Sequence, residues 1–194
     1  QRQMCIRDRI YAAARNPASI TLAGVTPIQL DVTNAADIAA AAARCTDVTL
    51  LINNAGIGRG SSFLAPGSAD AARAELETNF FGPLALSQAF APALKANGGG
   101  AIVNVLSVLS WLNLSPAATY SASKAAAWSL TNGLRGELRG QGTQVVGVHV
   151  GYMDTDMTRG LDAPKPTRWT WRARPWPQWK RARTRYWPTS SAAA

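Results

Sequence analysis

The sequence predicts a parallel α/β fold, and three observations lead to this prediction. Short apolar runs rich in β-branched residues alternate along the chain with alanine-rich stretches of helical character, which is typical of a parallel sheet with crossover helices. The apolar runs lack a clean apolar-polar alternation, as expected for strands covered on both faces. With 194 residues and 47% hydrophobic content, the chain can bury the core of one domain.

The expected elements follow from these runs in order. We expect strands at residues 10–14, 25–30, 48–52, 101–106 and 144–150, and helices at residues 35–44, 69–96 and 117–139. Asn34 or Thr33 can cap the first helix through its side-chain oxygen. Three glycines at residues 98–100 are expected to end the second helix, because glycine readily adopts the conformation that terminates helices.

Composition argues against several classes of protein. Cys5 and Cys45 lack metal-ligand spacing, and the one histidine, His149, lies in an apolar run, so we expect neither a metal site nor a disulfide. The sequence contains no apolar stretch long enough for a membrane span and no signal-peptide pattern. We therefore expect a soluble, cytoplasmic protein without a membrane partner.

The two ends differ in composition from the region between them, and we divide the chain at residues 1–9, 10–164 and 165–194. Residues 1–9 show no periodicity, and we interpret them as non-native sequence, with a disordered native terminus as the alternative. Residues 165–194 carry eight basic residues, five tryptophans and no acid, so the formal charge of +9 lies mainly there.

This tail has no amphipathic period. It could be a nucleic-acid-binding arm, an interfacial membrane segment or an out-of-frame translation, and we favour the last because tryptophan, arginine and proline codons shift readily into those for small residues. We expect the tail to be disordered and expect no nucleic-acid partner, although basic and aromatic side chains together can bind single strands.

The residues with the clearest chemistry lie at 103–126. Ser107 is expected at the end of a strand, and Tyr120 and Lys124 fall on the next helix at i and i+4, which places them on one face. A nearby ammonium group lowers the pKa of a phenol, so we expect Tyr120 to act as a general acid/base near neutral pH. The pair alone could equally be a surface pair on an amphipathic helix.

Other motifs accompany this pair in the same order and spacing as in a known family. They are LLINNAGI at 50–57, TNFFG at 78–82, Ser107 thirteen residues before Tyr120, YSASKAA at 120–126 and VHVGYMDTDM at 148–157. With them, residues 10–164 resemble the classical short-chain dehydrogenase/reductase family. The resemblance implies a Rossmann-like, doubly wound parallel sheet with helices on both faces.

The resemblance also implies catalytic roles. Tyr120 would exchange a proton with a carbonyl or alcohol oxygen, Ser107 would hydrogen-bond that oxygen, and Lys124 would lower the pKa of Tyr120 and hold the nicotinamide ribose. Asn79 would hold a water that links Lys124 to solvent. For Asn79 the alternative is a helix-kinking residue with a satisfied side chain.

Cofactor contacts are implied at several positions. Asn53, Ala55 and Gly56 would lie beside the adenosine ribose, and Tyr120, Lys124, Gly151 and Thr155 near the nicotinamide. Asp31 and the Val32 backbone would receive the adenine, unless Asp31 instead caps the helix that follows. Arg15 follows the first expected strand, where a cation suits the 2′-phosphate of NADP(H). NADP(H) is therefore the expected cofactor, with NAD(H) as the alternative. Arg15 could instead be a solvated loop arginine with no role in cofactor binding.

The sequence departs from the family in ways that limit these expectations. No strand with a glycine-rich turn precedes residue 10, so we expect the first strand and the glycine-rich loop to be missing, with the gap between the strands at 10–14 and 48–52. Val150 stands where the family more often has proline. The tail replaces the family's last helix and strand.

We therefore expect an NADP(H)-dependent oxidoreductase that interconverts a small-molecule carbonyl and an alcohol, impaired in this chain, with a homo-oligomeric parent enzyme. A non-catalytic Rossmann-like scaffold and nucleic-acid binding through the tail are the alternatives. Trp111, Leu112, Leu114 and Tyr152 would border the site and indicate an apolar substrate, or belong to the core.

Overall fold

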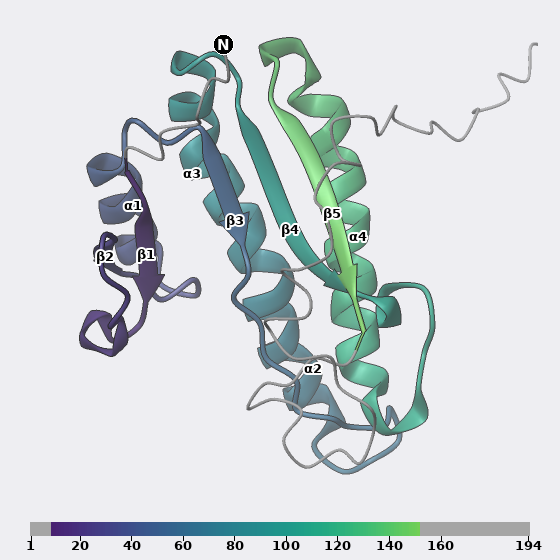
Figure 1. Ribbon diagram of the computed structural model, residues 1–194. Helices are drawn as coiled ribbons and strands as arrows, with labels where there is room; N and C mark the ends of the chain where they lie inside the picture. Colours follow the sequence, from purple (N-terminus) through teal and green to yellow (C-terminus); the bar gives the residue numbers. More distant parts are fainter. Residues whose placement is uncertain (1–8, 152–194) are drawn as a thin grey trace, which may run out of the picture. The chain divides into compact units, whose positions relative to one another are not determined.

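Five parallel strands and four α-helices form the part of the chain that the structure describes. The computed structural model describes residues 9–151, and Figure 1 shows their arrangement. The strands are β1 (Tyr11–Ala14), β2 (Thr26–Gln29), β3 (Leu50–Asn53), β4 (Ala101–Ser107) and β5 (Gln144–Val150), and the helices are α1 (Ala35–Arg44), α2 (Ser68–Leu76), α3 (Gly82–Ala96) and α4 (Ala118–Glu137).

The strands pair in two parallel groups. β1 pairs with β2, with Tyr11 opposite Thr26, and β3, β4 and β5 pair in that order, with Leu50 opposite Ala101 and Ala101 opposite Gln144. Among residues 9–151 no strand pairs with the free side of β1 or of β3. The interruption therefore falls where the sequence predicts it, and the expected parallel α/β architecture is confirmed.

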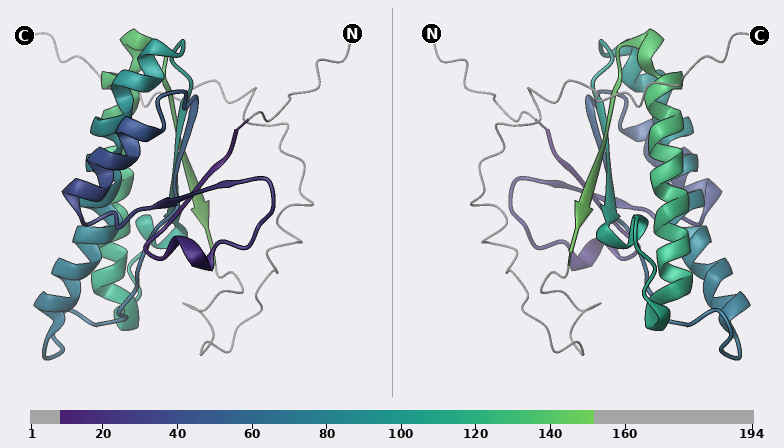
Figure 2. Two further views of the ribbon diagram at one scale, coloured as in Figure 1. Left: turned by 90° about the vertical axis from the view of Figure 1, so that its left-hand side faces the viewer. Right: turned by 90° about the vertical axis from the view of Figure 1, so that its right-hand side faces the viewer.

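All four α-helices lie on one side of the strands, as the edge-on views in Figure 2 show. Side chains pointing to this side fill two adjoining clusters: one contains Ile28 and Phe90, the other Leu94, Ile102 and Val145, and Leu51 packs against both. On the opposite side Leu50 and Ile52 remain more than half exposed. We expected helices on both faces of the sheet, and within the described residues they lie on one face only.

The helices begin and end for identifiable reasons. The Asn34 side chain accepts hydrogen bonds from the amides of Ala36 and Asp37 and caps α1, which confirms one of the two expected caps. The expected single helix at 69–96 is instead α2, a π-helical turn (Glu77–Phe81) and α3. The expectation of one regular helix was wrong here, because the π-helical turn shifts the backbone register at Asn79.

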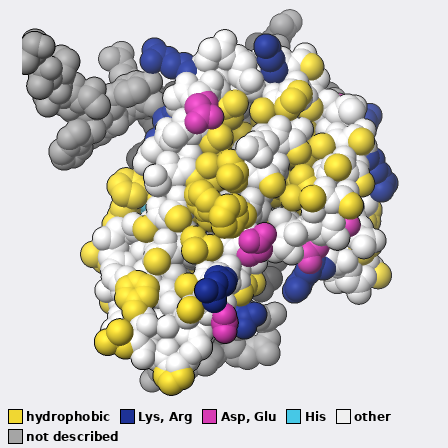
Figure 3. All heavy atoms as spheres, turned by 180° about the vertical axis from the view of Figure 1, so that it is seen from behind, with side chains coloured by type: hydrophobic (Ala, Val, Ile, Leu, Met, Phe, Trp, Pro, Cys, Tyr) yellow, Lys and Arg dark blue, Asp and Glu magenta, His cyan; other side chains and the backbone are white. Residues whose placement is uncertain are grey.

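The outer side of the helices carries apolar side chains. Figure 3 looks onto this side, and hydrophobic side chains gather near its middle. Elsewhere on the helical segments, Phe81 is 48% exposed and Trp128 39% exposed, and the Trp128 ring lies edge-on to those of Trp111 and His149. None of the helices in the described part of the chain is long and apolar enough to cross a membrane. Within the same residues, no group of three or more His, Cys, Asp or Glu is placed to hold a metal ion.

Candidate active site

The three side chains expected to carry the chemistry lie together where β4 ends. Ser107 is the last residue of β4, and its side chain lies close enough to that of Tyr120 on α4 to lower the pKa of Tyr120. Lys124 Nζ lies 5.8 Å from the centre of the Tyr120 ring and donates a hydrogen bond of 3.0 Å to the Val105 carbonyl of β4. The helical i, i+4 spacing thus aims both side chains at the end of one strand.

Burial is the main cause of the pKa shifts of Tyr120 and Lys124. It raises the pKa of Tyr120 above its ordinary value; the hydrogen bond with Ser107 lowers the pKa, and the charge of Glu75 raises it further. Lys124 is 5% exposed, and loss of hydration lowers its pKa to about 8. The expected lowering of the Tyr120 pKa by Lys124 was wrong for this structure, because the cost of burying a phenolate is the largest effect, and the effect that lowers the pKa comes from Ser107 and not from Lys124.

Asn79 occupies the interior of the site with all its side-chain groups engaged. Its Oδ1 accepts from the Ile57 amide at 2.9 Å, while its Nδ2 donates to the Ile57 carbonyl and to Ser123 Oγ, both at 2.9 Å. Asn79 also lies in the π-helical turn. The interpretation as a satisfied polar residue at a helix distortion therefore holds, and its role in a proton relay stays a prediction.

Gly56 is placed where a side chain would be crowded by two polar groups. A Cβ atom at this position would lie 3.1 Å from Asn79 Oδ1 and 3.4 Å from Lys124 Nζ. The absence of a side chain therefore lets the backbone after β3 pass close to both polar groups. This close approach supports the expectation that Gly56 belongs to the site, and Ala55 beside it is exposed.

Asn53 lies apart from the surface that a ligand could reach. Its side chain is 5% exposed, and its Nδ2 donates to Asn104 Oδ1 at 2.8 Å; Asn104 in turn donates to Thr131 Oγ1 at 2.9 Å. This buried chain of hydrogen bonds joins β3, β4 and α4. Its direct role is to hold the strands in register, so a contact between the Asn53 side chain and a cofactor stays a prediction.

The residues expected at the adenosine end lie where β1 and β2 end. Asp31 Oδ1 accepts from the amide and the hydroxyl of Thr33, at 2.9 and 2.7 Å. These two bonds and the charge of Arg15 hold the pKa of Asp31 below its ordinary value, against a small opposing effect of burial. Asn34, not Asp31, caps α1, so the alternative that Asp31 caps the helix was wrong.

Other expected site residues lie near the end of β5 or beyond the described part. Gly151 follows β5 and is exposed, whereas Thr155 and Tyr152 lie outside the described residues, as do most of residues 1–9 and all of 165–194. Trp111 and Leu112 are more than half exposed, and Leu114 is 44% exposed. The alternative that these three belong to the core was therefore wrong.

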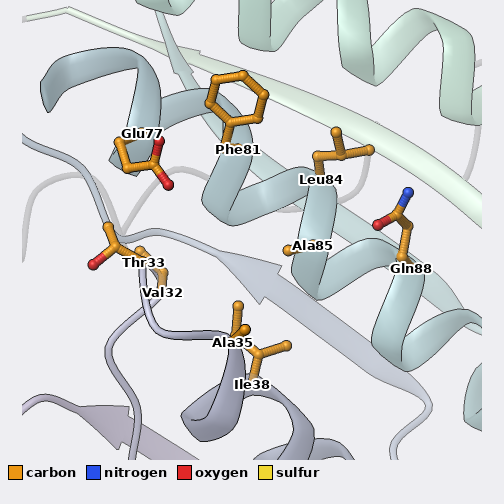
Figure 4. A pocket seen from close by; sticks show the side chains of 9 residues that line it. All are labelled: Val32, Thr33, Ala35, Ile38, Glu77, Phe81, Leu84, Ala85 and Gln88. Carbon is orange, nitrogen blue, oxygen red and sulfur yellow. The ribbon is translucent and has the colours of Figure 1, made fainter. Parts of the chain in front are cut away.

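A shallow pocket lies beside Val32, away from Ser107 and Tyr120. It has a volume of about 250 Å³, and Figure 4 shows its lining by the start of α1, by Glu77 and Phe81 of the π-helical turn and by α3. Val32 is its only member among the expected cofactor-binding residues. Ser107, Tyr120 and Lys124 are not among its lining residues, so this pocket is separate from the group that meets at the end of β4.

The sequence analysis missed two features of the site. His149 Nδ1 lies 3.0 Å from the Ser107 carbonyl, and the His149 ring stacks on Trp111 at 3.8 Å. Burial lowers the pKa of His149, partly opposed by its contact with Ser107. Glu75 is fully buried in α2. His149 lies within the VHVGYMDTDM motif at 148–157 but was noted only as a histidine in an apolar run. Glu75 lies outside the quoted motifs, although an acid amid a helix's apolar positions could have attracted attention.

Comparison with known proteins identifies the family. The model of the short chain dehydrogenase family matches residues 7–166. The chain belongs to the short chain dehydrogenase family. It is 36% identical over 162 residues to galactitol 2-dehydrogenase (L-tagatose-forming) of Cereibacter sphaeroides, a match that covers 80% of the chain and 63% of that enzyme.

Solved structures of this dehydrogenase family share the fold. A short chain dehydrogenase of Burkholderia cenocepacia in complex with NADP matches with a TM-score of 0.79 and 45% identity, over 82% of this chain and 68% of that one. A gluconate 5-dehydrogenase from the same organism, in complex with NADP and tartrate, matches with a TM-score of 0.71 and 32% identity, over 78% and 64%. The chain thus spans about two thirds or less of several relatives.

Proposed function

We propose that this short chain dehydrogenase is an NADP(H)-dependent oxidoreductase that interconverts a carbonyl and an alcohol through Ser107, Tyr120, Lys124 and Asn79. The observation that carries the proposal is the meeting of Tyr120 and Ser107 at the end of β4, with Lys124 beside the Tyr120 ring. Two neighbouring hydroxyl groups can both form hydrogen bonds with one substrate oxygen. A merely structural helix would not need this arrangement.

The chain's own groups would manage the proton and the charge on the substrate oxygen. Because burial raises the pKa of Tyr120, its phenol holds a proton at neutral pH and can donate it to a carbonyl oxygen. Ser107 Oγ would donate a second hydrogen bond and stabilise the developing negative charge. Lys124, with a pKa of about 8, can then return a proton toward Tyr120.

The described residues fit the two ends of a dinucleotide. Gly56 lets the backbone approach Lys124 and Asn79, as a ribose contact would require, and the cation of Arg15 beside Asp31 suits a 2′-phosphate. Bound NADPH would supply the hydride. NADP in two related structures supports the same choice, with NAD(H) as the alternative, and the exposed Trp111 and Leu112 favour an apolar substrate.

Binding and turnover measured separately test the proposal. NADPH binding, followed by its fluorescence, should be retained in Tyr120→Phe, whereas reduction of a panel of ketones and aldehydes should fall by about 10²-fold or more because the proton donor is gone. Tyr11→Phe is the matched control, since Tyr11 binds Asp47 far from the motif residues. Turnover that Tyr120→Phe leaves unchanged would favour the non-catalytic scaffold. The expected homo-oligomer and the tail's role stay predictions.

A further inference from the structure

The loop that follows β3 is fixed at every second residue between 57 and 61. Asn79 holds the amide and the carbonyl of Ile57. At the other end, the Thr119 amide donates to the Ser61 carbonyl at 3.1 Å, and Thr119 Oγ1 donates to the same oxygen at 3.3 Å. Thr119 immediately precedes Tyr120, so this loop lies against the part of α4 that carries the proton donor.

Glu75 provides the contact in the middle of the loop. Its Oε1 accepts a hydrogen bond of 2.6 Å from the Arg59 amide. Glu75 stands four residues before Asn79, and this spacing brings the two side chains to the same side of the helical segment. Ile57, Arg59 and Ser61 are thus held by three side chains, one from α2, one from the π-helical turn and one from α4.

A carboxyl group is a costly choice for this position. Glu75 has no exposed surface, and its Oε2 has no hydrogen-bond partner among the described residues. Burying a carboxylate with an unsatisfied oxygen opposes folding. A glutamine could accept the same bond from Arg59 through its amide oxygen without a charge. The charge itself is therefore the feature that needs an explanation.

We propose that Glu75 is a positioning residue of the Tyr120 and Lys124 site, which fixes the loop at Arg59 against α4 and places its carboxyl group in the interior of the site. The inference rests on the proposed function, because it gives Glu75 a part in the same proton transfer. It assigns the residue no contact with substrate or cofactor.

The charge of Glu75 acts on Tyr120 through space. Glu75 raises the pKa of Tyr120, in the same direction as burial and against the hydrogen bond from Ser107. Among the residues that the structure describes, the other charged or titratable groups at this site are Lys124 on α4 and His149 on β5, whose ring contacts the Ser107 carbonyl. Glu75 is the acid among them, and it favours the protonated phenol that a carbonyl reductase needs.

Titration of Tyr120 by NMR tests the charge without requiring turnover. In chain labelled with ¹³Cζ-tyrosine, the Tyr120 signal is the one of four tyrosine signals that Tyr120→Phe removes. Glu75→Gln should lower the pKa of Tyr120 by roughly half a unit or more, because a buried negative charge is lost. Glu77→Gln is the matched control, since Glu77 lies on the same helical segment but is exposed.

Amide hydrogen exchange tests the loop contact in the same samples. Glu75→Gln should keep the protection of the Arg59 amide, whereas Glu75→Leu should raise its exchange rate about ten-fold or more. A Tyr120 titration in Glu75→Gln that coincides with the unsubstituted chain, including no titration in either up to pH 12, overturns the role of the charge. Unchanged Arg59 exchange in Glu75→Leu overturns the role of the contact. If Glu75→Leu fails to fold, the titration of Tyr120 in Glu75→Gln alone decides whether Glu75 acts on Tyr120. Both readouts are independent of enzymatic activity, so they can fail while the proposed function stands.

Discussion

Replacing Lys124 by methionine should stabilise the folded chain while abolishing the proposed chemistry. Burial lowers the pKa of Lys124 from 10.5 to about 8, and each pKa unit corresponds to about 1.4 kcal/mol. The folded state therefore loses about 3 kcal/mol by holding the charged form below pH 8. Loss of the hydrogen bond to the Val105 carbonyl costs about 1 kcal/mol, so a net gain of about 2 kcal/mol is expected at pH 7.

The gain should depend on pH in a defined way. Between pH 8 and 10.5 the unfolded chain still holds the Lys124 proton and the folded chain has released it, so raising the pH favours the folded state. The unsubstituted chain should thus become more stable over this range, and the advantage of Lys124→Met should shrink. We restrict the comparison to pH 7–10, because the raised pKa of Tyr120 lowers stability above pH 10.

Urea unfolding followed by circular dichroism at pH 7, 8, 9 and 10 measures these differences. Lys95→Met is the matched control, because Lys95 is exposed on α3 and its loss removes no buried charge. A Lys124→Met chain that is less stable than the unsubstituted chain at pH 7, or whose advantage is constant from pH 7 to 10, would refute the reasoning. A gain in stability with loss of function is common where a site holds a strained or buried charge.

Two further predictions concern the scaffold. Gly100→Ala should destabilise the chain by about 2 kcal/mol or more, because Gly100 has a positive φ and a Cβ there would meet the Thr49 carbonyl; Gly98→Ala, with positive φ but open space, should cost less in the same thermal unfolding assay. Asn34→Ala should lower the free energy of unfolding by about 1 kcal/mol through loss of the α1 cap, and Asn34→Ser should restore most of it. Equal losses for the two glycines, or no rescue by serine, would contradict these arguments.

The sequence was sufficient for the features that depend on local patterns. The parallel strands, the Asn34 cap and the placement of Tyr120 and Lys124 on one helix face follow from periodicity, capping chemistry and i, i+4 spacing, whereas the meeting of Tyr120 with Ser107 was implied by the family resemblance. These are properties of neighbouring residues, and they survive folding because each element is locally consistent with the whole.

What depends on three-dimensional burial could not be predicted. The pKa of Tyr120 is raised because its environment is dry, and no spacing in the sequence measures hydration. Asn79 in the π-helical turn makes hydrogen bonds with Ile57 and Ser123, 22 and 44 residues away in the sequence, and no local pattern indicates such distant partners. Glu75 likewise became notable only because its carboxyl group is fully enclosed.

The interruption between β1 and β3 has a consequence for how the molecule opens. No strand pairing connects the group of β1, β2 and α1 to the group of β3, β4 and β5 among the described residues, so the side chains clustered around Ile28 and Phe90 provide most of the connection. Two groups of strands that are held together by side-chain packing alone can separate without breaking the backbone hydrogen bonds within either group. A dinucleotide that reached both the residues at the ends of β1 and β2, including Arg15 and Asp31, and those near Ser107 and Tyr120 would add a second connection between the two groups of strands and so stabilise the molecule.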